Sequence, residues 1–211
     1  MCSFGVPIVA RGGRMRRVWL VGLIVVLLTL VVTAGCGGPT FKGKLRRSVE
    51  TAPDFTLTDV HGNPFHLADQ KGNVVLLYFG YTYCPDVCPT TLGDFKRVHT
   101  QLGDLADRVR FVLITADPDR DTPERLAKYL TFFGDDFIGL VGSAEELQSV
   151  YDKYGVFVEK QQAEGSAAQY LVSHTANVFL IDPDGNWRLV YEFGTAPEDM
   201  VQDITALLEK S

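Results

Sequence analysis

Two cysteines that directly follow an apolar run constrain this chain more than any other feature. Residues 74–79 are rich in β-branched and aromatic side chains, which predicts a strand buried on both faces. Cys84 falls in the loop after that run. Cys88 precedes Pro89, a residue that suits the first turn of a helix. We therefore expect Cys88 near a helix N-terminus, where a thiolate is favoured, and a pair that can form a disulfide or bind a soft metal ion.

Strands and helices alternate in the sequence around this pair. Residues 52–72 read as a β-hairpin that turns at 61–63, and residues 160–170 as a mobile loop without periodicity. Further strands are predicted at 109–115, 138–141, 175–181 and 187–193, and helices at 90–102, 123–133, between Ser143 and Gly155, and at 197–208. This order predicts an α/β, thioredoxin-like fold with an N-terminal β-hairpin extension, in which the cysteines lie where the central strand meets its helix.

Residues 1–36 have the pattern of an export signal. Basic residues precede the apolar run 18–32, and small residues lead to Cys36. The ending resembles the lipobox of bacterial lipoproteins, in which the cysteine becomes the lipidated first residue, although Thr33 stands where leucine is usual. The alternative is an uncleaved membrane anchor, for which the run is short because a span needs about 20 residues. Both interpretations tether the chain to a membrane and place the rest of it outside the cytoplasm, on the extracytoplasmic or periplasmic side.

The charge is divided between a basic front and an acidic domain. Residues 37–51 are basic and predict a flexible tether, which stays solvated or rests on anionic lipid headgroups. Residues 48–211 carry 12 Lys and Arg against 26 Asp and Glu, a formal balance of −14. Nucleic acid is a poor partner for such a surface. We expect residues 52–211 to form the functional domain.

Cysteine usage assigns Cys84 and Cys88 to each other. Of the four cysteines, Cys2 lies in the leader and Cys36 is the predicted lipidation site, which leaves one pair in the domain. In an oxidising compartment two thiols this close form a dithiol/disulfide couple. A purely structural disulfide is the alternative.

His174 changes the interpretation from a simple redox pair to a metal site. Thioredoxins have a proline before a later strand, next to their dithiol, and the matching stretch LVSHTANVFL has none and offers His174. In the predicted fold this imidazole reaches the thiols from across the sheet. Two thiolates and one imidazole suit copper, especially Cu(I).

Three segments together resemble the Sco/SenC copper-binding proteins of cytochrome c oxidase assembly. They are CPDVCP at 84–89, DPDRDTPERL at 117–126 and SHTANVFLIDPDG at 173–185. The resemblance implies copper ligands at Cys84, Cys88 and His174, with Cu(I) or Cu(II) as the ion. Ser173 stands where an aspartate is common in the family, which leaves a contact that orients His174 in question. The loop 117–121 is expected to border the site and is assigned no ligand.

The function implied is a metallochaperone rather than an enzyme. Its expected partner is cytochrome c oxidase subunit II, to whose binuclear site it delivers copper or whose thiols it maintains, with other copper chaperones or thioredoxin-like reductants as further partners. The alternative is a thiol–disulfide oxidoreductase or peroxiredoxin-like enzyme that uses Cys84 and Cys88 alone. A copper or redox sensor is a third interpretation, for which the sequence offers no output domain.

Overall fold

A mixed β-sheet forms the centre of the domain that begins at Phe41. The computed structural model describes residues 40–162 and 170–210. The leader and Cys36 lie outside the described residues. In spatial order, the eight strands of this sheet in the described residues are β1 (Lys44–Thr51), β10 (Asn186–Tyr191), β9 (Val178–Ile181), β4 (Val74–Gly80), β5 (Val109–Thr115), β6 (Ile138–Val141), β2 (Thr56–Asp59) and β3 (Pro64–His66).

Strand β4 is the central strand, as the sequence predicts. It pairs in parallel with β5 and antiparallel with β9, and every one of its residues is buried. Because side chains alternate along a strand, Leu76 and Tyr78 belong to one hydrophobic cluster while Leu77 and Phe79 belong to another on the opposite face. The two-sided burial explains why the sequence here is continuously apolar.

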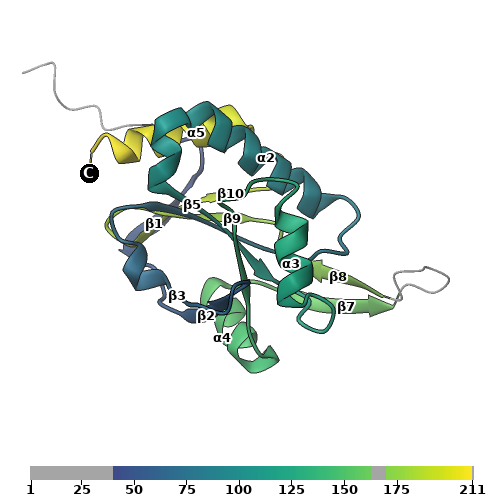
Figure 1. Ribbon diagram of the computed structural model, residues 1–211. Helices are drawn as coiled ribbons and strands as arrows, with labels where there is room; N and C mark the ends of the chain where they lie inside the picture. The colour runs from purple at the N-terminus through teal and green to yellow at the C-terminus, as the bar shows by residue number, and fades with distance from the viewer. Residues whose placement is uncertain (1–39, 163–169, 211) are drawn as a thin grey trace, which may run out of the picture. The chain divides into compact units, whose positions relative to one another are not determined.

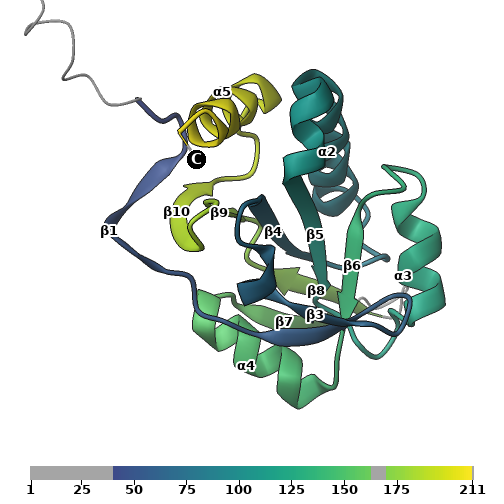
Figure 2. The same ribbon diagram turned by 60° about the vertical axis from the view of Figure 1, so that its left-hand side comes forward.

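Helices cover both faces of the sheet. Helix α2 (Val87–Leu102) lies beside α5 (Pro197–Leu208) on one face, and α4 (Ala144–Tyr154) lies on the other (Figures 1 and 2). Helix α3 (Pro123–Leu130) packs on the same cluster as α2 through its buried leucines. Short 3₁₀ helices, η1 (Leu67–Gln70) and η2 (Gly103–Arg108), connect neighbouring strands and helices.

Two strands form a separate small sheet that extends from the domain. Strand β7 (Val158–Gln162) pairs antiparallel with β8 (Tyr170–His174), and Val158 lies opposite His174 (Figure 1). The prediction of a loop over 160–170 is therefore wrong at its two ends, which belong to β7 and β8. These residues are polar and show no hydrophobic period, and it is backbone pairing that makes them strands. Residues 163–169 lie outside the described residues.

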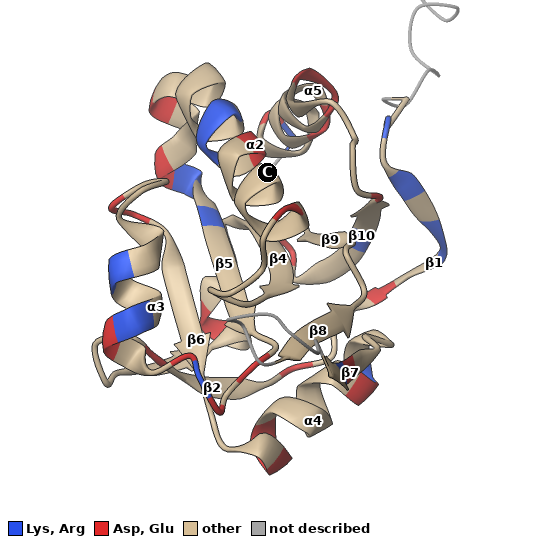
Figure 3. Cartoon of the chain, turned by 90° about the vertical axis from the view of Figure 1, so that its right-hand side faces the viewer, with Lys and Arg blue, Asp and Glu red and all other residues tan. Residues whose placement is uncertain are grey.

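Other element boundaries also differ from the sequence prediction. Residues 44–51 form β1, which pairs with β10, so the predicted flexible tether is wrong over this stretch. The guanidinium of Arg46 lies 3.8 Å from the ring centroid of Trp187, so a basic residue here covers an aromatic ring of the sheet. Lys and Arg lie along β1 and on α2, α3 and β5, while Asp and Glu lie on α4, on α2 and α5, and in several loops (Figure 3). Helix α2 begins three residues earlier than predicted, α3 ends at Leu130, and β9 begins at Val178 rather than at 175.

The α/β, thioredoxin-like class is confirmed by this arrangement. The predicted hairpin corresponds to β2 and β3, which pair with each other and lie at the edge of the sheet beyond β6. In the part of the chain that the structure describes, no helix has the length and apolar character needed to cross a membrane.

Candidate metal centre

The two cysteines lie where β4 gives way to α2. Cys84 is in the connecting loop and half-buried, whereas Cys88 is the second residue of α2 and fully buried. The backbone N–H of Cys88 donates to the Cys84 sulfur over 3.3 Å, so an N–H of the first helical turn faces that sulfur. Both thiols are free in the structure. The disulfide between them stays a prediction.

His174 reaches the thiols from β8, of which it is the last residue. Its Nε2 atom lies 3.4 Å from the Cys88 sulfur, and its Nδ1 atom lies 3.1 Å from the carbonyl oxygen of Thr175. A carbonyl oxygen only accepts, so Nδ1 carries the proton and donates it. The lone pair of Nε2 then faces the thiols. An imidazole that is protonated on one nitrogen and has a free lone pair on the other is the form that binds metals.

The three side chains offer one compact set of ligand atoms. The sulfurs of Cys84 and Cys88 and a ring nitrogen of His174 all lie within 4.8 Å of one another. In residues 40–162 and 170–210, this is the one cluster of three or more His, Cys, Asp or Glu with such spacing. Two soft sulfurs and an imidazole are a donor set that fits copper.

The thiols differ strongly in acidity. The pKa of Cys84 is lowered to about 4, mainly because its sulfur accepts hydrogen bonds from the Cys88 thiol and from the backbone N–H groups of Asp86 and Cys88. The pKa of Cys88 is raised by the same contact with Cys84 and by burial. The pair therefore shares one proton at neutral pH, with the thiolate on Cys84.

Two tyrosines of the cysteine segment enclose the imidazole. The ring centroids of Tyr78 and Tyr81 lie 6.0 Å and 5.8 Å from that of His174, and both rings meet the imidazole edge to face. The Tyr78 hydroxyl is buried near Cys88 and Thr91 but makes no hydrogen bond of normal geometry, and burial, followed by Cys88, raises its pKa. The half-buried imidazole thus packs against two aromatic rings.

Gly80 leaves the space that Cys88 occupies. A Cβ atom at Gly80 would lie 3.1 Å from the Cys88 sulfur, 2.8 Å from the Tyr78 ring and 3.2 Å from Leu113. The end of β4 can approach the first turn of α2 this closely only because residue 80 has no side chain.

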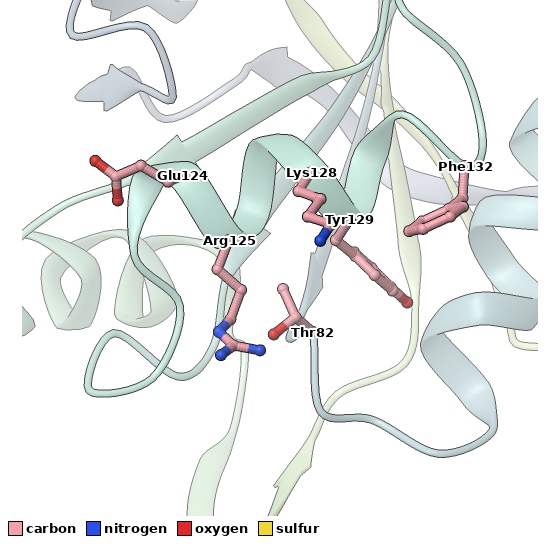
Figure 4. Close-up of a pocket in the computed structure, with 6 residues that line it drawn as sticks. All are labelled: Thr82, Glu124, Arg125, Lys128, Tyr129 and Phe132. Carbon is pink, nitrogen blue, oxygen red and sulfur yellow. The ribbon is translucent and has the colours of Figure 1, made fainter.

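An open pocket of about 430 Å³ lies beside the cysteine loop (Figure 4). None of the three candidate ligand side chains lines it, so it is distinct from the metal centre. Its lining comes from α3, from the turn after α3 and from the segment before Cys84, namely Thr82, Glu124, Arg125, Lys128, Tyr129 and Phe132.

The structure places Cys84, Cys88 and His174, and it adds residues that the sequence did not single out, whereas Cys36 lies outside the described residues. Ser173 lies opposite Glu159 in the small sheet, and the contact that orients His174 comes from the Thr175 backbone instead. The aromatic enclosure was not predicted, although Tyr78 and Tyr81 stand in the segment that carries the cysteines. Their role depends on which way the rings point, and a sequence pattern does not give that.

Known proteins match this chain over the whole domain. Residues 43–209 match the family described as SCO1/SenC. An SCO2-like protein of Rickettsia conorii is 35% identical over 155 residues, which cover 74% of this chain and 76% of that protein. The alignment thus extends over most of the domain in both chains.

Two solved structures share the fold, and in each the match covers nearly all of that protein's own chain. Bradyrhizobium japonicum ScoI with copper bound is 34% identical, with a TM-score of 0.68, over 75% of this chain and 99% of that chain. Apo Sco1 from Thermus thermophilus is 38% identical, with a TM-score of 0.70, over 80% and 97%. With the family match, the shared fold and the Cys84, Cys88 and His174 cluster in place, this chain belongs to the SCO1/SenC family.

Proposed function

We propose that this protein binds one copper ion through the sulfurs of Cys84 and Cys88 and the Nε2 atom of His174. The observation that supports this most is the convergence of the three atoms within 4.8 Å, with Nε2 left as an acceptor. Bound copper in the solved ScoI structure is a further support. Cu(I) suits this donor set best because it is soft and accepts few ligands, and Cu(II) is the second ion to test.

The redox state of the cysteines would control metal loading. Thiolates are ligands and a disulfide is not, so the dithiol form binds copper and the disulfide form releases it. Binding displaces the proton that the two thiols share. We expect one copper per chain after anaerobic loading of the dithiol form and none after loading of the disulfide form. Equal copper content in both forms would contradict this role for the cysteines.

The proposed partner is subunit II of cytochrome c oxidase, with the protein held at the membrane outside the cytoplasm. Membership of the SCO1/SenC family and the leader that ends at Cys36 support this proposal. A direct test mixes the copper-loaded domain with the soluble copper-binding domain of subunit II and follows the metal. Mass spectrometry of the full chain, with Cys36→Ser as control, tests lipidation.

A thiol–disulfide exchange role is the second candidate, and the acidity of Cys84 favours it. A half-exposed thiolate beside a buried thiol is the arrangement of an attacking and a resolving cysteine. The Cys84 thiolate would attack a partner disulfide and form a mixed disulfide while one partner thiolate leaves. The Cys88 thiol would then attack the Cys84 sulfur, close the Cys84–Cys88 disulfide and release the second partner sulfur, which takes up the Cys88 proton, so that two electrons pass to the partner.

The two candidates differ in what they require of His174. Copper binding uses the imidazole as a ligand, whereas disulfide exchange needs only the two sulfurs. A His174→Ala variant that loses copper affinity and keeps its rate of partner-disulfide reduction assigns the imidazole to the metal. Unchanged copper affinity in that variant would favour the exchange role alone.

A further inference from the structure

The loop between β5 and α3 carries two buried carboxylates that are not among the proposed copper ligands. Asp117 is 0% exposed and Asp121 is 2% exposed. Burial of carboxylates is costly unless their oxygens are hydrogen-bonded. Asp121 is hydrogen-bonded to the segment that leads to Cys84, and Asp117 is hydrogen-bonded to the strand that carries His174.

Asp121 holds the segment that leads to Cys84. Its carboxylate accepts hydrogen bonds from the backbone N–H of Thr82 over 3.2 Å and from the Thr82 hydroxyl over 2.6 Å. The hydroxyl of Thr115, at the end of β5, donates to the second carboxylate oxygen over 2.8 Å. Since Thr82 is two residues before Cys84, Asp121 fixes the start of the cysteine loop to the end of β5.

Asp117 and Arg120 hold the strand that leads to His174. The Nε atom of Arg120 donates to Asp117 over 2.5 Å, and the Tyr170 hydroxyl donates to the other Asp117 oxygen over 2.7 Å. Arg120 also donates to the Tyr170 carbonyl oxygen over 3.1 Å, and its guanidinium lies 3.5 Å from the Tyr170 ring centroid. Tyr170 begins β8 and His174 ends it, so these contacts fix the start of the histidine strand.

Tyr81 fixes the middle of the same strand. Its hydroxyl accepts a hydrogen bond from the backbone N–H of Val172 over 3.2 Å, and its ring meets the imidazole of His174. Strand β8 pairs with β7 and belongs to the small sheet rather than the central one. Its placement over the cysteines therefore depends on side-chain contacts of this kind.

We propose that the loop Asp117–Asp121 positions the two halves of the metal centre relative to each other. Asp117 and Arg120 are positioning residues for His174, and Asp121 is a positioning residue for the Cys84 loop. The inference rests on the proposed copper ligands. It gives the DPDRD stretch of the sequence a role beyond starting α3.

A purely stabilising role explains these contacts less well. A buried ion pair such as Asp117 with Arg120 contributes little net stability, since desolvation of both charges offsets their attraction. The planar guanidinium of Arg120 instead makes several hydrogen bonds at once, which fixes the direction and the distance of Asp117 and Tyr170 relative to it. Geometry at His174 is the property that such a contact can supply.

The test is a double-mutant cycle on copper affinity. Arg120→Gln and His174→Ala are made singly and together, and the dissociation constant for Cu(I) is measured anaerobically. Loss of a residue that orients a metal ligand weakens binding about 10-fold to 100-fold. We expect Arg120→Gln to weaken Cu(I) binding by this factor in the parent. In the His174→Ala background the same substitution should cause no further weakening, because Arg120 acts through the imidazole.

Two further variants give the contrast that the proposal requires. Asp121→Asn should weaken copper binding by the same factor in both backgrounds, since it acts through the cysteine loop. Arg125→Gln is the matched control, because the Arg125 guanidinium lies 4.7 Å from the Tyr83 ring and no described hydrogen bond joins it to β8. We expect parent affinity from this control. Tyr170→Phe, which removes only the hydroxyl bond to Asp117, replaces Arg120→Gln if the latter does not fold.

A readout without copper separates failure of this inference from failure of the proposed function. Hydrogen exchange at the Val172 amide should become faster in Arg120→Gln and stay unchanged in Arg125→Gln. If the parent and His174→Ala bind copper equally, the ligand set is wrong, and the exchange measurement alone decides the role of the loop. The inference would be overturned if Arg120→Gln weakened Cu(I) binding equally in both backgrounds, or did not weaken it in the parent. It would also be overturned if Val172 amide exchange stayed unchanged in Arg120→Gln.

Discussion

The Nε2 atom of His174 lies 3.4 Å from the Cys88 sulfur, although the two residues are 86 positions apart in the chain. One side chain is on β8 and the other on α2, so the contact exists only when the small sheet packs over the end of β4. Copper affinity should therefore report on how β8 is placed as well as on the ligands themselves.

Gly80→Ala should destabilise the domain and disturb the metal centre together. The added Cβ would lie 2.8 Å from the Tyr78 ring and 3.1 Å from the Cys88 sulfur, both in a fully buried environment. Overpacking of this kind costs about 1–3 kcal/mol, measured as the free energy of unfolding in urea.

Gly93→Ala is the control for that measurement. Gly93 is inside α2, and a Cβ atom added there would meet no atom within 4 Å, so alanine should raise the free energy of unfolding by roughly 0.5–1 kcal/mol. Equal effects from the two substitutions would show that close packing at Gly80 is not what the site needs.

Tyr78→Phe should raise the stability of the copper-free protein by about 1 kcal/mol. The Tyr78 hydroxyl is buried and makes no hydrogen bond of normal geometry, so its removal relieves a desolvation cost while the ring packing on Phe95 and His174 remains. Tyr191→Phe is the matched control, because the Tyr191 hydroxyl donates to Asp203 over 3.1 Å.

The control should lose about 1.5–3 kcal/mol, as expected for a hydrogen bond to a charged group. Chemical denaturation of both variants gives the comparison. A loss of stability in Tyr78→Phe as large as that in Tyr191→Phe would mean that the Tyr78 hydroxyl does make a stabilising bond.

Alkylation of Cys84 should be almost independent of pH between about 5 and 8. Because its pKa is lowered to about 4, the thiolate is fully formed across that range, and the rate falls only as the pH falls through about 4. An ordinary thiol, with a pKa of about 8.5, would instead react about ten times faster for each unit of rising pH. Cys88 is buried and should not compete.

The rate constant with iodoacetamide, followed by mass spectrometry, checks this profile. Cys88→Ala removes the strongest cause of the low pKa, the hydrogen bond that the residue 88 side chain donates to Cys84, and the profile should shift to higher pH. A parent profile that rises steadily from pH 5 to pH 8 would contradict the shared proton between the two thiols.

The central fold and the cysteine pair could be predicted because each leaves a local mark in the sequence, whereas His174 is predicted only through the expected fold and the family resemblance. Residues 74–79 are apolar on both faces, Pro89 marks the start of α2, and Ser143 caps the N-terminus of the helix predicted to follow it. Such signals depend on nearby residues alone.

The features that the sequence did not predict depend on pairing between distant segments. Strand β1 is polar and basic and is ordered by its register with β10, and β7 is ordered by β8. The contacts of Arg120 with Tyr170 join residues 50 positions apart. A local hydrophobic period carries no information about contacts of this range, so the sequence alone predicts a tether, a loop or a turn in these places.

Anaerobic titration of the reduced domain with Cu(I), compared with Cys84→Ser, Cys88→Ser and His174→Ala, tests the central claim most directly. We predict one copper per chain in the parent and an affinity at least about tenfold lower in each variant, since loss of a ligand should cost no less than loss of a group that orients one. Parent affinity in His174→Ala would contradict the account, because the imidazole would then contact the thiols without binding their metal.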